Sequence, residues 1–132
     1  MSFVVHWGKL FAQEYANLPL EQQEKVDDFI DLFERHGING YLREYPGKMV
    51  NSWDPVPTSD KQYYHARSNH LWHYHIGLPE YKQRGQAPYM TSRDLLHFSW
   101  PHKKNEIVLV CLAPHYVDGK FFMPGIDHLV KL

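Results

Sequence analysis

The residues of this chain best suited to do chemistry lie in one short segment, residues 63–77. Residues that otherwise indicate a β-strand are interrupted there by five proton-active or cationic side chains: His65, Arg67, His70, His73 and His75. Histidine is the one side chain whose unperturbed pKa lets it give or accept a proton near neutral pH. Such side chains are unfavourable in a buried apolar strand. We therefore expect the segment to contact a phosphate, transfer a proton or hold a metal ion.

The distribution of charge indicates a surface for a polyanion. The net charge is only −1, but residues 1–60 carry five Lys or Arg against ten Asp or Glu, whereas residues 61–104 carry seven against two. Six of the ten histidines fall in that basic block, together with several aromatic residues. Clustered cations with interleaved aromatics favour nucleic acid as the partner. An ordinary solvated surface is the alternative interpretation.

Individual residues of the basic block are candidates for contacting RNA. Arg67 and Arg93 are candidate phosphate clamps, because a guanidinium group binds phosphate through two parallel hydrogen bonds. A surface ion pair with a carboxylate such as Asp94 is the alternative for these arginines. Tyr81 and Tyr89 can stack on a base or simply pack. Four further cations would hold the polyanion without doing chemistry, namely Lys82, Arg84, Lys103 and Lys104.

Hydrophobic periodicity predicts a strand and two helices before the basic block. Residues 3–7 combine the β-branched and aromatic side chains typical of a strand. Residues 9–17 and 20–36 carry apolar side chains at helical spacing. Pro19 separates the two segments, because the residue before a proline avoids the helical conformation. The sequence therefore predicts an N-terminal strand followed by a helical hairpin.

The second half predicts a small, mainly antiparallel sheet, and the fold class is therefore α+β. Residues 62–76 alternate and indicate a strand with a turn near residue 68, after a long loop at 38–60 with one short strand near 48–53. Residues 95–100 and 107–113 indicate a hairpin.

The alternation also predicts where the histidines point. His73 and His75 share one face of their strand, and His97 joins them if its apolar neighbours Leu96 and Phe98 point into the core. We expect the helical hairpin to cover the opposite face of the sheet. The three histidines would then lie on a face that is left open.

Composition limits the class of protein further. A chain of 132 residues with 43% hydrophobic content is long enough for one packed domain, residues 1–132. It has no apolar run long enough to span a bilayer, so no membrane is expected as a partner, and the first residues do not have a signal-peptide pattern. The single cysteine, Cys111, lies in an apolar run and is expected to be buried. These features favour a cytoplasmic location.

Several parts of the sequence resemble the RelE/ParE toxin superfamily. Residues 3–7, a short helix and the segment Leu18-Pro-Leu-Glu-Gln-Gln-Glu-Lys-Val-Asp-Asp-Phe-Ile30 are similar to the strand and Leu-Pro-broken helical hairpin that open these toxins. The later half looks most like the YafO branch. It does so through His73-Tyr-His-Ile76, Ser92-Arg-Asp-Leu-Leu-His97 and the strand ending in Cys111-Leu-Ala-Pro-His115. The resemblance covers most of residues 3–116 and is absent from 117–132.

The resemblance implies a RelE-like fold and a ribosome-dependent mRNA interferase, the toxin of a type II toxin–antitoxin system. Its partners would be mRNA, the ribosome and a cognate antitoxin protein, and it would need no metal or other cofactor. Such an endoribonuclease cuts by attack of the ribose 2′-OH on the adjacent phosphate, which requires a base, positive charge and an acid. The positions assigned to proton transfer and phosphate contact are His73, His75, His97 and His115, with Arg67 and Arg93 stabilising the phosphorane.

Three other functions remain open at this point. The spacing His73-x-His75-x4-Glu80 is that of a cupin metal motif, and two imidazoles two residues apart on a strand can chelate one ion. A cupin is a β-sandwich, however, in which a helix over residues 20–36 does not belong. A gyrase-inhibiting protein of the ParE type would use the same fold without the histidines. A non-catalytic interaction protein would cleave nothing.

Overall fold

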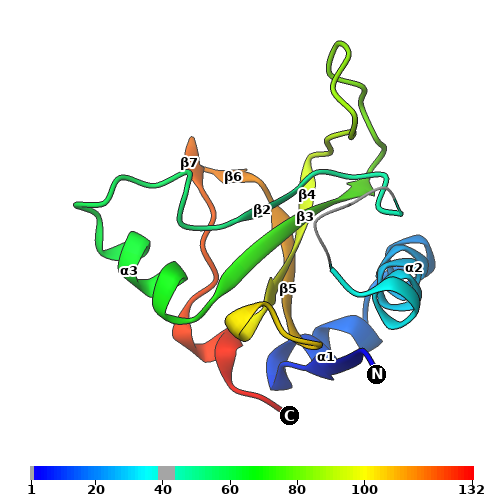
Figure 1. Cartoon of the computed structure of the whole chain (residues 1–132), viewed down its shortest axis with the longest axis horizontal. Coiled ribbons are helices and arrows are strands. Elements are labelled where there is room, and N and C mark those ends of the chain that lie inside the picture. The colour runs from blue at the N-terminus through cyan, green and yellow to red at the C-terminus, as the bar shows by residue number, and fades with distance from the viewer. Residues whose placement is uncertain (1, 39–43) are drawn as a thin grey trace.

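The computed structural model describes residues 2–38 and 44–132 and has an α+β architecture (Figure 1). The helices are α1 (Lys9–Ala16), α2 (Leu20–His36) and α3 (Lys61–Ser68), with 3-10 turns η1 (Pro101–Lys103) and η2 (Ile126–Leu129). The strands are β1 (Val4–Trp7), β2 (Met49–Asn51), β3 (Leu71–Leu78), β4 (Asp94–Ser99), β5 (Glu106–Pro114), β6 (Tyr116–Val117) and β7 (Lys120–Phe121). The predicted N-terminal strand, helical hairpin and α+β class are confirmed.

The main sheet is mixed but mainly antiparallel, as expected. Its strand order is β1-β5-β4-β3-β2, in which β1 runs parallel to β5 and every other neighbouring pair is antiparallel. β6 and β7 form a separate two-stranded hairpin. The short strand expected near residues 48–53 is β2. Part of the loop predicted over 38–60, residues 39–43, lies outside the described residues.

Helix α2 supplies the core that holds β3 and β4 in place. Its buried stripe is Val26, Phe29 and Phe33, each at most 1% exposed. The Phe29 ring lies 5.0 Å from Tyr74 on β3 and 5.5 Å from Phe98 on β4, measured between centroids. Tyr74 and Phe98 therefore point toward the helices. Because successive side chains of a strand point to opposite faces, the histidines of β3 and β4 lie on the other face of the sheet.

Residues 61–68 form a helix, and the strand predicted for residues 62–76 is wrong in its first half. The Asp60 side chain accepts a hydrogen bond from the Gln62 amide at 2.8 Å and caps the start of α3. Ala66 is fully buried on the face that packs against the sheet. The alternation expected over residues 62–76 did not take into account the N-cap residue Asp60, which is the local signal for this helix. His65 and Arg67 lie on α3, away from the strand of His73 and His75.

Replacing Asp60 by alanine should destabilise the protein by about 1 kcal/mol, because the first-turn amide of α3 loses its cap. Urea denaturation followed by tryptophan fluorescence measures this difference. Thr58→Ala serves as a control in the same loop, since Thr58 is exposed and caps no helix of the described residues. Equal stability of the Asp60 variant and the native protein would contradict the assignment of α3.

The face of the sheet opposite α1 and α2 is covered, which corrects the expectation that it is open. Helix α3 and the C-terminal segment lie across it (Figure 1). Leu71, Val110 and Cys111 are buried there beneath α3, together with the partly buried side chains of Phe122 and Leu129. The burial of Cys111 is as predicted, and it raises the pKa of the thiol. The histidines that β3 and β4 place on this face, His73, His75 and His97, are therefore buried.

No helix in the described ranges, residues 2–38 and 44–132, has both the length and the apolar character needed to cross a membrane.

Candidate functional site

Four histidines predicted to act together form one cluster on the covered face of the sheet. His73 and His75 come from β3, His97 lies opposite His73 on β4, and His115 follows the end of β5. The ring centroids are 6.0 Å apart for His73 and His97, 6.0 Å for His73 and His115, and 5.5 Å for His75 and His115. The fold thus brings together the four histidines that were predicted to act together.

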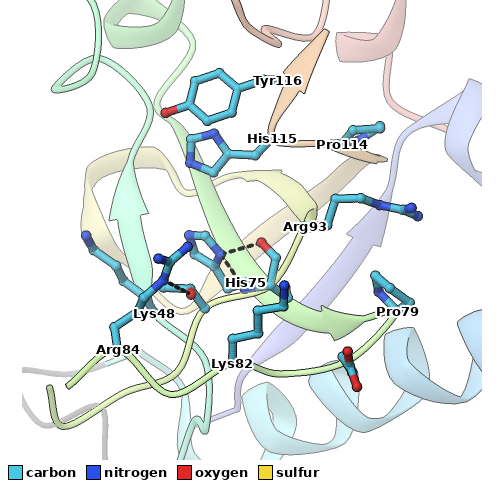
Figure 2. Close-up of a pocket in the computed structure, with 12 residues that line it drawn as sticks. Lys48, His75, Pro79, Lys82, Arg84, Arg93, Pro114, His115 and Tyr116 are labelled. Atoms are coloured by element: carbon cyan, nitrogen blue, oxygen red, sulfur yellow. Dashed lines mark hydrogen bonds between the residues drawn. The ribbon is translucent and has the colours of Figure 1, made fainter. Parts of the chain in front are cut away.

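A cavity of about 600 Å³ opens beside two of these histidines, His75 and His115 (Figure 2). Four cationic side chains line it, and three of them, Lys48, Lys82 and Arg84, form no ion pair with any carboxylate among the described residues. The full lining is Lys48, His75, Pro79, Glu80, Lys82, Arg84, Thr91, Ser92, Arg93, Pro114, His115 and Tyr116. The excess of positive charge suits a phosphate-bearing ligand.

The backbone at Gly47 places Lys48 at the cavity. The His75 amide donates to the Lys48 carbonyl at 2.9 Å, and the Lys48 amide donates to the Met90 carbonyl at 2.9 Å. A Cβ atom on Gly47 would lie 1.8 Å from the His75 carbonyl oxygen, so only glycine permits this approach. Lys48 is therefore a site residue that the sequence analysis missed, since nothing in the sequence pairs residue 48 with residue 75.

The segment between β3 and β4 carries the predicted cations Lys82 and Arg84. Its two arms pair with each other, because the Lys82 amide donates to the Thr91 carbonyl at 2.7 Å and the Thr91 amide donates back at 2.9 Å. Arg84 Nε donates to Thr91 Oγ1 at 3.1 Å. These contacts hold the segment in a defined arrangement that directs both cations to the cavity.

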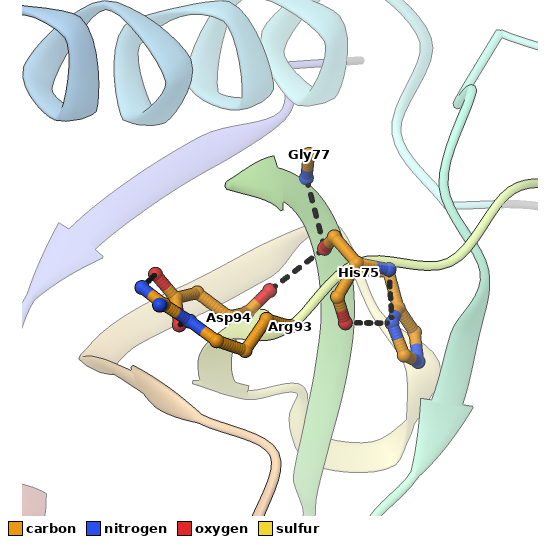
Figure 3. A network of polar contacts seen from close by, with 5 residues as sticks. His75, Gly77, Arg93 and Asp94 are labelled. Carbon is orange, nitrogen blue, oxygen red and sulfur yellow. Dashed lines mark hydrogen bonds and ion pairs between the residues drawn. The ribbon is translucent and has the colours of Figure 1, made fainter. Parts of the chain in front are cut away.

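Ser92 orients His75 through its backbone and ties the neighbouring strands together through its side chain (Figure 3). His75 Nδ1 lies 3.0 Å from the Ser92 carbonyl oxygen and 2.9 Å from the Ser92 amide nitrogen, so either tautomer of the ring has a partner. The Ser92 hydroxyl accepts from the Gly77 amide and donates to the Asp94 carbonyl. These contacts use Nδ1 and leave Nε2 of His75 for a ligand.

His73 and His97 lie behind the cavity and do not line it. His73 Nδ1 shares a hydrogen bond with Ser52 Oγ at 2.9 Å. His97 is fully buried, and neither ring nitrogen has a hydrogen-bond partner among the described residues. The ring of Phe122 from the C-terminal segment lies 5.8 Å from it. His97 therefore shares the predicted face, but it is not accessible there.

Burial keeps the clustered histidines neutral. Loss of hydration lowers the pKa of His73 to about 2, of His75 to about 4 and of His97 to about 3, because the interior disfavours the charged ring. Neighbouring positive charge acts in the same direction, from His115, Lys48 and Arg84 in the case of His75. The pKa of the half-buried His115 is also lowered, mainly by burial. A neutral imidazole is the form that accepts a proton or binds a metal ion.

His115 is held at the mouth of the cluster by its backbone. Its amide donates to the Arg93 carbonyl at 2.8 Å, and its carbonyl accepts from the Phe122 amide at 3.0 Å. Its ring lies 4.3 Å from that of Tyr116. The Nδ1 atom of His115 is buried and has no hydrogen-bond partner among the described residues.

The remaining predicted residues divide between this cavity and other places. Arg93 lines the cavity, but its guanidinium contacts Asp94 at 2.9 and 3.1 Å, which is the alternative that the sequence left open. Arg67 and Lys103 line a separate hollow with Trp72 and do not join the histidines. Three others take no part in the cluster: Lys104 is exposed, Tyr81 shares a hydrogen bond with Tyr74, and Tyr89 lies beside Lys48.

Comparisons with known proteins give no match to this chain, whether with protein-family models, curated proteins or solved structures. The geometry of the site therefore carries the functional argument.

Proposed function

We propose that the chain is a metal-independent endoribonuclease that cleaves RNA by attack of the ribose 2′-OH on the adjacent phosphate. The observation that carries the proposal is the pair His75 and His115, which open onto a cavity rimmed by unpaired cations. This combination offers proton transfer and phosphate binding at one place, the two demands of the reaction.

His75 is the proposed general base. With Nδ1 protonated and donating to the Ser92 carbonyl, its Nε2 has a free lone pair for the 2′-OH proton. The lowered pKa keeps the ring unprotonated at neutral pH. The Ser92 contact also fixes the ring, so the base is oriented before RNA binds.

Lys48, Lys82 and Arg84 are the proposed phosphate-binding groups. The attack places additional negative charge on the non-bridging oxygens of the phosphorane, and fixed cations stabilise that charge more than they stabilise the starting diester. Arg93 adds charge at the rim although Asp94 neutralises part of it.

His115 is the proposed general acid for the leaving 5′-oxygen. A bound phosphodiester brings negative charge beside the ring and raises the pKa of the imidazole, which favours its protonated form in the complex. The reaction then leaves a 2′,3′-cyclic phosphate and a 5′-hydroxyl. His73 and His97 act as supports behind this pair.

The resemblance to RelE/ParE toxins, and to their YafO branch in particular, extends the proposal to the biological setting. It supports an mRNA interferase that acts on mRNA in the translating ribosome, in the cytoplasm, and that a cognate antitoxin protein silences. The basic, histidine-rich block agrees with a polyanionic partner.

Primer-extension mapping of a defined mRNA in a translation extract tests the proposal. We expect cuts only with translating ribosomes, 2′,3′-cyclic phosphate ends, and no cut at a site whose ribose is 2′-deoxy. A ribosome-free arm with and without EDTA shows whether free RNA is cut and whether a metal ion is needed. Intact RNA in every arm would reject the nuclease, and cutting abolished by EDTA on free RNA would reject the metal-independent mechanism.

A further inference from the structure

The histidine cluster contains a second arrangement that general acid–base chemistry does not require. One ring nitrogen from each of His73, His75 and His115 lies within 4.8 Å of the corresponding nitrogens of the other two. We infer that these three histidines form a binding site for one borderline divalent transition-metal ion, of which Zn²⁺ is the probe. The cupin-like set suggested by the sequence included Glu80, but this group has His115 in its place.

The spacing needs only a small contraction to accept an ion. Tetrahedral Zn²⁺ with metal–nitrogen bonds of about 2.0–2.1 Å separates its ligand nitrogens by about 3.4 Å. His73 and His75 are fixed on β3, whereas His115 lies beyond the end of β5 with a half-buried side chain. The half-buried ring of His115 has the most room to turn toward the other two rings as the site contracts around the ion.

Two of the ligands already have the outer contacts that metal-binding histidines use. A ligating imidazole usually donates its second N–H to a carbonyl or another polar oxygen, which fixes the tautomer and the ring orientation. His75 Nδ1 lies 3.0 Å from the Ser92 carbonyl oxygen, and His73 Nδ1 lies 2.9 Å from Ser52 Oγ. Both Nε2 atoms are thereby left for the ion, and His115, whose buried Nδ1 has no hydrogen-bond partner among the described residues, completes the set.

The ligand chemistry selects the class of ion. Three imidazoles without a carboxylate suit Zn²⁺, Cu²⁺, Ni²⁺ or Co²⁺ and not the oxygen-seeking Mg²⁺ or Ca²⁺. His75 and His115 face the cavity, so a fourth coordination position opens toward Lys48 and Arg84. These cations favour an anion, such as hydroxide or phosphate, as the fourth ligand.

Ion binding has a consequence for catalysis that rests on the proposed function. The ion would coordinate the nitrogen of His75 that accepts the 2′-OH proton. It would also coordinate His115, which could then no longer act as the general acid. A loaded site would therefore leave RNA uncut, which makes the metal ion an inhibitor of the proposed nuclease.

Metal titration of the full chain, stripped with chelator and containing no RNA, tests the site. We expect one Zn²⁺ per chain by calorimetry, visible Co²⁺ absorption typical of tetrahedral coordination, and no uptake of Mg²⁺. His115→Ala should weaken Zn²⁺ binding at least about 10-fold, and Ser52→Ala should weaken it about 10–100-fold by releasing the His73 ring. Circular dichroism confirms that each variant is folded, and Ser52→Ala retains all three ligands.

His102→Ala is the matched control, because His102 is exposed and its ring lies beside that of the half-buried His70, with centroids 4.8 Å apart, away from the cluster. This variant should bind Zn²⁺ as the native protein does. The inference is overturned if the native protein takes up no Zn²⁺, or if uptake is lost in His102→Ala and unchanged in the His115 and Ser52 variants. A protein that binds Zn²⁺ but never cuts RNA would reject the proposed function alone, and a nuclease without Zn²⁺ uptake would reject this inference alone.

Discussion

Replacing His75 by asparagine is expected to lower the rate of RNA cleavage at neutral pH by about 10²–10⁴-fold, the usual contribution of a general base. An asparagine amide reaches about as far as imidazole Nδ1, so it can keep the hydrogen bonds to Ser92. It has no counterpart of Nε2 and cannot accept the 2′-OH proton. The variant therefore separates the chemistry of the ring from its structural contacts.

The measurement is the first-order rate of cleavage of a defined mRNA with the protein in excess. His36→Asn is the control, because His36 is exposed in the last turn of α2 and far from the cavity. Near-ultraviolet circular dichroism shows whether the tertiary packing survives. Cleavage by a folded His75→Asn protein at the rate of the control would remove His75 from the mechanism.

Acidification from pH 6.5 to pH 4 is expected to destabilise the protein strongly. The pKa values of His73, His75 and His97 are lowered to between about 2 and about 4 in the folded state, against 6.5 for a free ring. Below pH 6.5 the unfolded chain binds protons that the folded chain does not, so the free energy of unfolding falls as the pH falls. Each such histidine contributes up to about 1.4 kcal/mol per pH unit over this window.

Charges around the cluster reinforce this trend. Positive charge on Lys48 disfavours the protonated rings of His73, His75 and His115. Arg84 acts in the same way on His75, His128 on His97, and His115 on each of the other three. Urea denaturation at pH 7.5, 6.0, 5.0 and 4.5 gives the dependence directly.

His97→Leu distinguishes the histidines from the carboxylates that also titrate in acid. Leucine has a similar volume, and it removes a buried ring whose two nitrogens have no partner among the described residues. The variant should be more stable than the native protein at pH 5 and should lose less stability between pH 7.5 and pH 5. The same slope in both proteins would show that His97 is not neutral inside the fold.

The N-terminal half could be predicted from the sequence because its signals are local. The apolar stripe of α2, its end at Gly37 and the break at Pro19 depend on residues within a few positions of one another. The same holds for the alternation of β3 after residue 71 and for the β4–β5 hairpin. The grouping of His73, His75 and His97 on one face followed from period two along paired strands.

The two errors have different causes. The strand predicted over residues 61–68 overlooked a local signal, the cap at Asp60, and a long-range one, the packing of Ala66 on the sheet. The covering of the second sheet face is set by long-range contacts alone. It depends on the C-terminal segment, which carries no strong periodic signal. The sequence could not show that Phe121 and Phe122 lie against the histidines.

The sequence by itself determined the α+β class, the helical hairpin and the concentration of histidines and cations in one block, since residue type and spacing are sufficient for these. Tertiary structure alone decided which of these residues form the site. It brought Lys48 and His115 to His75, placed Arg67 and Lys103 elsewhere, and buried His97. The physical reason is that cavities and pKa values depend on atoms brought close by packing, and those atoms come from residues far apart in the chain.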